Sequence, residues 1–229
     1  MPTNTKELER LLALANRRLN ASTEETVEMW RTLKSLANDL LVGAGFSDKS
    51  VKAMHTKFND AGRRSAPWKA FSSKVPGRPQ DGSDGNRINR WLLPKKHKFY
   101  ATEKDATLVQ IRYYLQMLSM EGAPCLPDKR LEPAFVWLAG HDIRAGLYED
   151  PIQLIPISLK AFLDNPRGIT SGHLIPLDRN GRHVPDNAFL MLHRSNQLQG
   201  NMTLEELLEL MTKILKRHQK RGVKGRHVG

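Results

Sequence analysis

The sequence has one cysteine, Cys125, among its 229 residues. A single thiol excludes an internal disulfide and a cysteine-rich zinc site, and it is compatible with a reducing compartment. No apolar run reaches transmembrane length, and charged residues interrupt the N-terminal stretch where a secretory signal would lie. No internal repeat is present. We therefore expect a soluble globular chain with no membrane partner.

Positive charge is what the sequence has in excess. The 36 Lys and Arg residues outnumber the 24 Asp and Glu residues, for a formal net charge of +12 and a pI near 10.0. Such an excess favours a polyanionic partner, and nucleic acid is the first candidate. The alternative is a basic surface without a specialised partner. With 39% hydrophobic residues, the chain can bury the core of one medium domain or two small ones.

Residues 1–60 have the pattern of a helical region. Apolar residues at helical spacing predict a helix over residues 5–19. Ser22 and Glu25 have the spacing of a capping box and predict the start of a second helix. Ser47 predicts the start of a third, which runs to residue 58. This region is either a recognition or dimerisation module or a helical bundle that only packs on the rest.

Residues 61–100 form a basic segment rich in Gly, Pro and Ser. Residues 60–100 hold ten Lys and Arg against three acids. Aromatic residues are interspersed, namely Trp68, Phe71, Trp91 and Tyr100. Such a segment suits phosphate contacts combined with stacking or groove insertion, so we expect it to contact DNA. The alternative is a solvated linker anchored by its aromatic residues, with a loop tip at residues 80–86.

Residues 101–229 supply the predicted core. An amphipathic helix is expected over residues 105–119, and a capping box at Thr203 and Glu206 predicts a helix near the C-terminal end. Residues 134–138 are apolar and fit either a helix or a strand. The polar residues of the middle region are interpreted as turn or surface residues rather than metal ligands; they are His141, Asp142, Glu149 and Asp150.

The stretch from residue 172 to residue 201 holds three unlike polar residues in a compact pattern. His173 opens an apolar run, and Asn180-Gly181 is a tight-turn signal. We expect a short return strand at residues 183–184. A helix is then predicted to start at residue 186 or 187 and to end at Gly200 or residue 201.

These three polar residues match the needs of phosphodiester hydrolysis. A histidine near neutral pH can take a proton from water. A hard cation such as Mg²⁺ can polarise the phosphate, and an amide oxygen is an acceptable ligand for it. A second amide can hold the loop that carries the histidine. His173, Asn187 and Asn196 are the candidates for these roles.

The same stretch resembles the HNH endonuclease motif, the ββα-metal fold. His173 precedes Asn187 by fourteen residues, and Asn187 precedes Asn196 by nine, as in that family. The resemblance covers about thirty residues, 170–201. It implies that His173 is the general base, that Asn187 holds the histidine loop, and that Asn196 is a metal ligand. It also implies Mg²⁺ or Mn²⁺ as the cofactor and products with 5′-phosphate and 3′-hydroxyl ends.

The stretch departs from the family pattern in two ways. The acid that usually precedes the histidine is replaced by Gly172, so one expected metal ligand is missing. The cysteine pairs that bind a structural zinc in many HNH proteins are also absent, with Leu192 and Ser195 at the matching helix positions. Apolar packing must therefore hold the unit together.

Other polar residues of the stretch are candidates for substrate contact. They are Arg179, Arg182, His183, His193 and Arg194. The arginines suit phosphate binding, and His193 lies one helical turn before Asn196. For His183, a surface imidazole is the alternative.

The sequence thus predicts a mostly α-helical fold with a small β-hairpin, in which a ββα-metal unit is embedded in a helical α+β protein. The predicted function is a metal-dependent endonuclease acting on double-stranded DNA, of the restriction, homing or phage-type nicking kind. It would act in the bacterial cytoplasm, whether bacterial or phage-encoded. Double-strand cleavage would favour a homodimer. The alternatives are a DNA-binding protein with a degenerate, inactive HNH unit and a structural protein whose motif is accidental.

Overall fold

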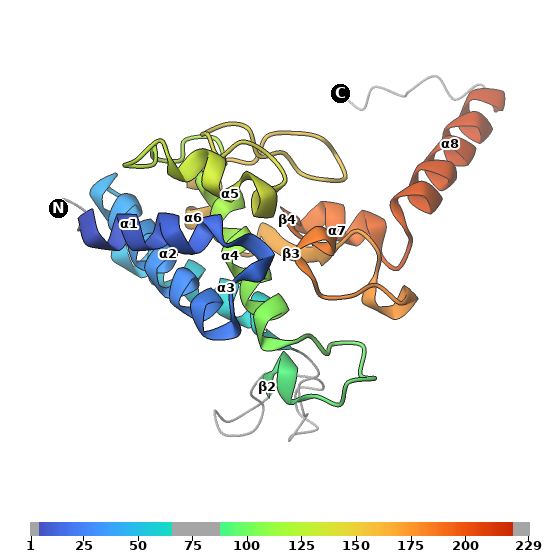
Figure 1. The fold of residues 1–229 in the computed structure, drawn as a ribbon. Coiled ribbons are helices and arrows are strands. Elements are labelled where there is room, and N and C mark those ends of the chain that lie inside the picture. Colours follow the sequence, from blue (N-terminus) through green and yellow to red (C-terminus); the bar gives the residue numbers. More distant parts are fainter. Residues whose placement is uncertain (1–4, 66–87, 222–229) are drawn as a thin grey trace, which may run out of the picture.

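The computed structural model describes residues 5–65 and 88–221 (Figure 1). The helices are α1 (Thr5–Asn16), α2 (Thr23–Gly43), α3 (Asp48–Gly62), α4 (Glu103–Leu118), α5 (Leu131–Ala139), α6 (Leu159–Asp164), α7 (His193–Gln199) and α8 (Leu204–Lys220). The strands are β1 (Arg64–Ser65), β2 (Ile88–Asn89), β3 (Ile169–His173) and β4 (Ala188–Leu192). The predicted mostly helical fold with a small β-hairpin is confirmed. The predicted loop tip and the aromatic residues Trp68 and Phe71 lie outside the described residues.

Side-chain caps confirm three predicted helix starts. Ser22 and Glu25 form a complete capping box at α2, and Thr203 and Glu206 form one at α8. Ser47 accepts a hydrogen bond from a backbone N–H in the first turn of α3. These signals are local, because each cap satisfies backbone groups within its own helix.

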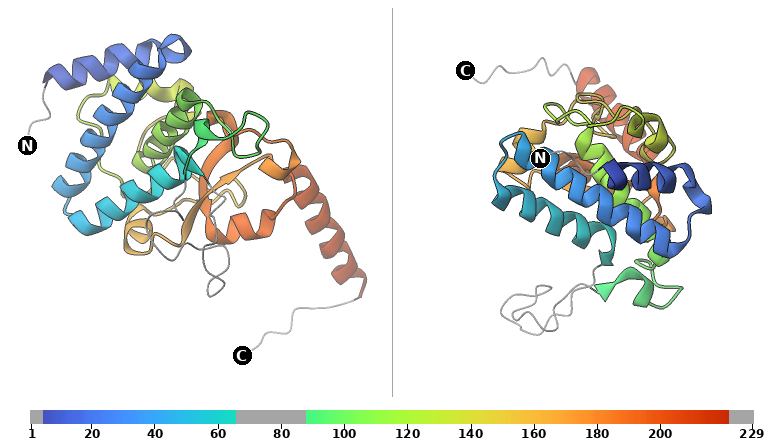
Figure 2. Two further views of the ribbon diagram at one scale, coloured as in Figure 1. Left: turned by 90° about the horizontal axis from the view of Figure 1, so that it is seen from below. Right: turned by 60° about the vertical axis from the view of Figure 1, so that its left-hand side comes forward.

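Helix α4 is the centre of the molecule. It packs against α2, α3, α5 and β4, and every residue from Ala106 to Leu118 is buried. One cluster of buried side chains extends from Leu11 on α1 to Leu190 on β4. The helices of the N-terminal region and the residues that follow position 101 therefore share one hydrophobic interior. Figure 2 shows this arrangement, with α4 (green) between the N-terminal helices (blue) and the hairpin (orange).

The β3–β4 hairpin corrects the expected elements of the HNH-like stretch. Strand β3 pairs antiparallel with β4, with Ile169 opposite Leu192 and His173 opposite Ala188. The return strand is therefore not at residues 183–184, and no helix starts at residue 186 or 187. The apolar run that was expected to be helical is a strand, and α7 begins only at His193. Short apolar runs fit both structures, and here pairing with β3 selects the strand.

Side chains from distant parts of the chain close the second edge of β4. Gln116 of α4 accepts a hydrogen bond from the Leu190 N–H at 2.9 Å, and the Tyr148 hydroxyl donates to the Leu190 carbonyl at 2.5 Å. Asp150 accepts from the Leu192 N–H at 2.8 Å. Asp150 is fully buried, so its interpretation as a surface charge is wrong. These bonds satisfy backbone groups that a two-stranded sheet leaves open.

Helix α8 extends away from the rest of the molecule (Figures 1 and 2). Leu207 is its one buried residue, while large apolar side chains farther along the helix are exposed; they are Leu208, Leu210, Met211, Ile214 and Leu215. Within the described parts of the chain, no helix is long and apolar enough to cross a membrane.

Candidate active site

The β3–β4–α7 unit carries the three polar residues predicted for the site. His173 is the last residue of β3, Asn187 directly precedes β4, and Asn196 lies in the middle of α7. Gln199 holds the helix to the end of β3, because its amide nitrogen donates to the His173 carbonyl at 3.0 Å and to the Leu174 carbonyl at 2.9 Å. The fold thus brings residues from both strands and the helix into one compact unit.

Asn187 joins the two arms of the loop between the strands. Its side-chain oxygen accepts from the Ile175 N–H at 2.7 Å, and its nitrogen donates to the carbonyls of Ile175 and Arg182, both at 2.9 Å. Both amide hydrogens and the oxygen of this buried side chain are bonded within the loop. Gly181 makes the turn sharp, since a Cβ there would lie 2.0 Å from the Ile175 carbonyl oxygen. The loop that follows His173 is therefore fixed.

A chain of hydrogen bonds sets the tautomer of His173. The His183 Nε2 lies 2.8 Å from the Gly62 carbonyl oxygen, and a carbonyl can only accept, so this nitrogen carries the hydrogen. The Nδ1 of a neutral His183 is then an acceptor, and His173 Nε2 donates to it over 2.9 Å. His173 therefore holds its hydrogen on Nε2. Its Nδ1 keeps a lone pair and bonds no described residue.

The surroundings keep both imidazoles neutral. Burial, followed by the positive charge of Arg90, lowers the pKa of His173 to about 3. Burial also lowers the pKa of His183 well below its usual range, and the charge of Arg90 adds to this. Arg90 is itself buried and donates to the carbonyls of Ala61 and Gly62 at the end of α3. His173 is thus available as a proton acceptor at neutral pH.

Helix α3 supports the site from the N-terminal half of the chain. Its Lys57 ammonium donates to the carbonyls of Pro166 and Ile169, at the start of β3. Its Gly62 crosses α4 so closely that a Cβ would lie 2.7 Å from the Gln110 Cβ. Sequence reasoning missed these supporting residues, because the partners of Lys57 lie more than a hundred positions away in the chain and Gln110 lies 48 positions from Gly62.

Asn196 faces the position that precedes the histidine. Its side-chain oxygen lies 3.1 Å from the place where a Cβ on Gly172 would stand. The thioether of Met191 fills the same space, with its sulfur and terminal methyl 2.5 Å from that place. A carboxylate at position 172 would thus lie beside Asn196, but Met191 now occupies the volume it would need.

The metal ligands available among the described residues are few, so they suit a cation that keeps most of its bound water. No group of three His, Cys, Asp or Glu side chains able to hold a metal occurs among residues 5–65 and 88–221. Asn196 offers one hard oxygen ligand. Mg²⁺ keeps several waters and commonly binds through few protein ligands together with substrate phosphates. The residues present therefore fit Mg²⁺ held by Asn196, water and phosphate.

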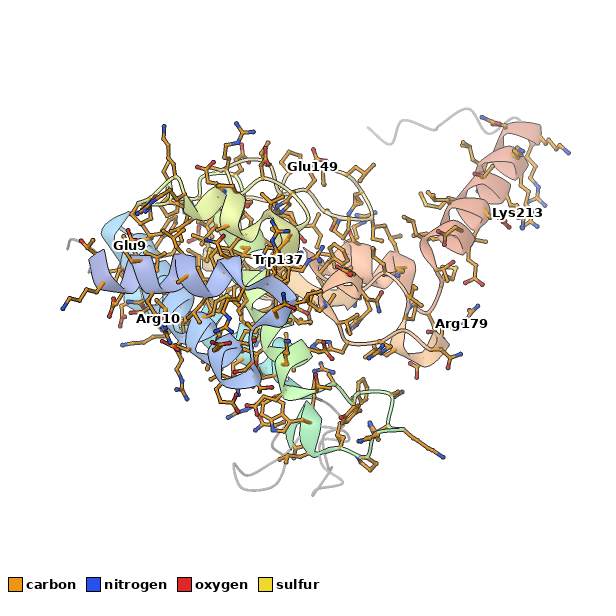
Figure 3. The ribbon with its side chains drawn as sticks, viewed as in Figure 1. Glu9, Arg10, Trp137, Glu149, Arg179 and Lys213 are labelled. Atoms are coloured by element: carbon orange, nitrogen blue, oxygen red, sulfur yellow. The ribbon has the colours of Figure 1, made fainter. Side chains whose placement is uncertain are left out.

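The five expected substrate contacts lie in different surroundings. His193, Arg194 and Arg182 are exposed, the first two on α7. Arg179 is paired with Glu206 at 2.8 Å and lies at the same end of the molecule as α8 (Figure 3). His183 is 1% exposed and has both ring nitrogens bonded, so the structure places it behind His173 and leaves it no free nitrogen for phosphate.

Comparisons with known proteins find a structural likeness to solved chains. No protein-family model matches the chain, and no curated protein matches it. A solved structure described as "Crystal structure of a type II restriction endonuclease" is similar, with a TM-score of 0.46 and 20% sequence identity. The match covers 58% of this chain and 62% of that one, less than two thirds of its length. A likeness with this TM-score does not indicate which reaction this chain catalyses.

Proposed function

We propose that this chain is a metal-dependent DNA endonuclease of the HNH type. The observation that carries the proposal is the hydrogen-bond chain from Gly62 through His183 to His173, which leaves the His173 Nδ1 free and unprotonated. A neutral imidazole on a fixed loop, next to a helix with an amide oxygen, is the arrangement that hydrolysis of a phosphodiester needs.

In the proposed reaction, the His173 Nδ1 accepts a proton from a water molecule. The water oxygen bonds the phosphorus as the bond to the 3′ oxygen breaks, and the departing 3′ oxygen takes a proton from solvent water, which gives 5′-phosphate and 3′-hydroxyl ends. Asn187 keeps the loop in place through its three backbone bonds, and His183 orients the ring. Mg²⁺ or Mn²⁺, held by Asn196, would neutralise charge on the phosphate.

DNA is the proposed substrate because the chain carries a formal net charge of +12. Exposed cations on and near the hairpin, including Arg182 and Arg194, suit contacts with the phosphate backbone. Site-specific cleavage and action as a homodimer in the bacterial cytoplasm are part of the same proposal.

A supercoiled-plasmid assay tests the reaction. We expect nicked or linear product with Mg²⁺ or Mn²⁺ and none with EDTA. His173→Ala should be slower by about 100-fold or more, the usual contribution of a general base. His218→Ala, which removes an exposed histidine on α8, is the matched control and should cleave like the parent. If the His173→Ala variant cleaved the plasmid as fast as the parent, His173 would not be the general base.

A second function is supported by Met191, which fills the space beside Gly172 where the family has a metal-binding acid. This observation favours a DNA-binding protein with an inactive HNH unit. Such a protein would retain plasmid DNA in a salt-sensitive manner, with no metal-dependent cleavage even at high protein concentration.

A further inference from the structure

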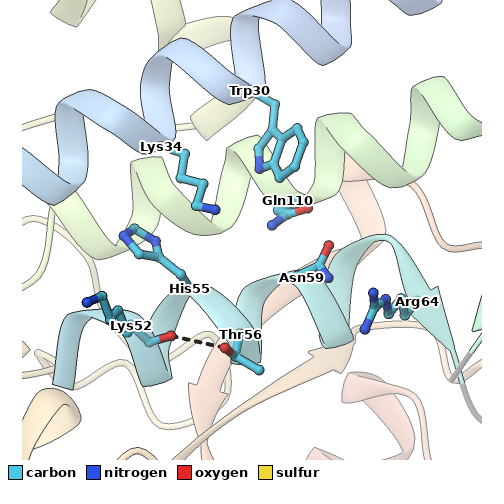
Figure 4. Close-up of a pocket in the computed structure, with 8 residues that line it drawn as sticks. All are labelled: Trp30, Lys34, Lys52, His55, Thr56, Asn59, Arg64 and Gln110. Atoms are coloured by element: carbon cyan, nitrogen blue, oxygen red, sulfur yellow. Dashed lines mark hydrogen bonds between the residues drawn. The ribbon is translucent and has the colours of Figure 1, made fainter. Parts of the chain in front are cut away.

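A groove between α2 and α3 lies outside the β3–β4–α7 unit. It consists of two adjoining cavities of about 400 and 560 Å³, which share Trp30, Lys34, Lys52 and His55. In Figure 4, Trp30 and Lys34 extend from α2 toward His55 and Asn59 of α3, with Gln110 of α4 behind them. Polar and charged groups from three helices thus converge on one space.

The groove and its rim carry excess positive charge. Arg63, Arg64 and Lys52 pair with Glu103, Asp60 and Asp48, respectively. Arg31 and Lys34 also line the groove, and no carboxylate among the described residues pairs with either of them. Two cations therefore stand uncompensated on the α2 side. An anion is the ligand class that this charge favours.

The indole ring of Trp30 contacts two cations at the groove, Arg63 and Lys34. The Arg63 guanidinium lies 4.6 Å from the centre of the indole ring, and the Lys34 ammonium lies 5.8 Å from it. The ring is fixed in turn, because the Gln110 side-chain oxygen accepts from its Nε1 at 3.1 Å in the amide orientation that also serves the Asn59 N–H. Cations already cover the ring, which favours a phosphate ligand over a stacked base.

His55 contributes a buried imidazole to the wall of the groove. It is 8% exposed, and its Nδ1 lies 2.7 Å from the Tyr114 hydroxyl. With the Gln110 oxygen engaged by Trp30 and Asn59, its amide nitrogen is the group that bonds the Tyr114 oxygen, so the hydroxyl donates to His55 Nδ1. The hydrogen of the neutral ring then lies on Nε2, which has no partner among the described residues. That nitrogen is itself buried, so the cations, and not His55, are the groups that the groove offers to a ligand.

Helix α3 connects the groove with the candidate active site. Helix α3 carries Lys52 on the groove, Arg64 follows the helix on β1, and Gly62 at the end of α3 accepts the hydrogen bond from His183. Lys52 and Gly62 are about 15 Å apart along the helix, which corresponds to about four base-pair steps of DNA. From these observations we infer that the α2–α3 groove binds the phosphate backbone of the DNA that enters the site. This inference rests on the proposed function.

The test is duplex binding by the full chain in EDTA, measured by fluorescence anisotropy over a range of salt concentrations. The groove variant is Arg31→Ala with Lys34→Ala. The control is Lys129→Ala with Arg144→Ala, which removes the same charge from exposed positions that do not line the groove. We expect the groove variant to bind at least tenfold more weakly. The slope of log affinity against log salt should fall by about 1.8, for two lost phosphate contacts, with the control unchanged.

Three results would overturn the inference. If the groove variant binds DNA with the affinity and the salt slope of the parent, the groove does not bind the phosphate backbone. The nuclease proposal would then be unaffected. An equal loss in both variants would show that only net charge matters. Displacement of the DNA by a mononucleotide at matched phosphate concentration would show that free nucleotide is the ligand. Groove-dependent binding without any plasmid cleavage would instead refute the proposed reaction alone, and circular dichroism confirms that each variant is folded.

Discussion

His183 illustrates how one side chain sets the chemistry of another. Its Nδ1 faces His173 and its Nε2 faces Gly62, so each nitrogen has a separate task that a substitution can isolate. Glutamine at this position can still donate to Gly62 but offers His173 no acceptor. Asparagine can still accept from His173 but does not reach Gly62.

We therefore predict opposite effects for the two variants. His183→Gln should stay folded and lose about tenfold to 100-fold in kcat with little change in KM, as when a residue that orients a catalytic group is removed. His183→Asn should keep more of kcat but melt at a lower temperature. Steady-state kinetics on a cleaved duplex and thermal melts measure both. A His183→Gln enzyme as fast as the parent would contradict the orienting role.

A second prediction for individual residues concerns Gly172 and Met191. Because Met191 fills the space beside Gly172, a carboxylate fits only if that side chain moves aside or is shortened. Gly172→Asp combined with Met191→Ala should place a carboxylate next to Asn196 and lower the Mg²⁺ concentration for half-maximal cleavage by about tenfold relative to Met191→Ala alone. Mn²⁺ binding followed by electron paramagnetic resonance gives a readout independent of activity. An unchanged metal affinity would show that position 172 does not face the cation.

Among the elements, α3 has the most constrained position. Its last residue, Gly62, crosses α4 with no room for a Cβ and also accepts the hydrogen bond from His183. Gly62→Ala should push the end of α3 away from Gln110, lower the free energy of unfolding by about 2 kcal/mol and slow cleavage.

Gly43→Ala is the control for that substitution. A Cβ at Gly43, the last residue of α2, meets nothing within 4 Å. This change should leave stability unaltered or raise it slightly, since alanine favours a helix more than glycine does. Chemical denaturation of both variants provides the comparison, and a Gly62→Ala protein as stable as the Gly43→Ala protein would rule out the close crossing.

The elements also show what the sequence predicts and what it does not. The starts of α2, α3 and α8 were predictable because Ser22, Ser47 and Thr203 cap their own helices. The strand β4 was not, because its leucine-rich run fits a helix equally well. What selects the strand is β3 together with side chains such as Asp150, which no local pattern connects to it.

The candidate site divides in the same way. Spacing within one stretch was enough to select His173, Asn187 and Asn196 as candidates. The supports of the site come from elsewhere: His183 depends on Gly62, 121 positions away, and β3 depends on Lys57. A pattern within one stretch of sequence does not reveal contacts between residues that are far apart in the chain. For this reason His183 was interpreted as a surface residue or a substrate contact.

For the molecule as a whole, buried neutral histidines link stability to pH. The pKa of His55 is lowered from 6.5 to about 4 by burial and, secondarily, by the charge of Lys34. The unfolded chain therefore binds a proton between these values that the folded chain does not. Stability from this group is complete above pH 6.5 and is lost as the pH falls toward 4.

Thermal melts between pH 4 and pH 8 should show this loss, and His55→Asn should reduce it. A shift of this size corresponds to about 3 kcal/mol at the acid end. The same direction holds for His141, His173 and His183, so the relevant quantity is the difference between parent and variant. An acid dependence identical in both proteins would show that His55 is not protonated on unfolding in this range.

The bond between His183 and Gly62 also limits how this chain can be engineered or recombined. A short stretch such as residues 169–201 could be moved to another scaffold as one piece. That piece would leave behind the carbonyl of Gly62 and the ammonium of Lys57. A chimaera that moves residues 169–201 to a new scaffold would carry His173 and lose the Gly62 carbonyl that fixes its tautomer through His183. In this chain, α3 and the β3–β4 hairpin would have to be transferred together for the site to keep its geometry.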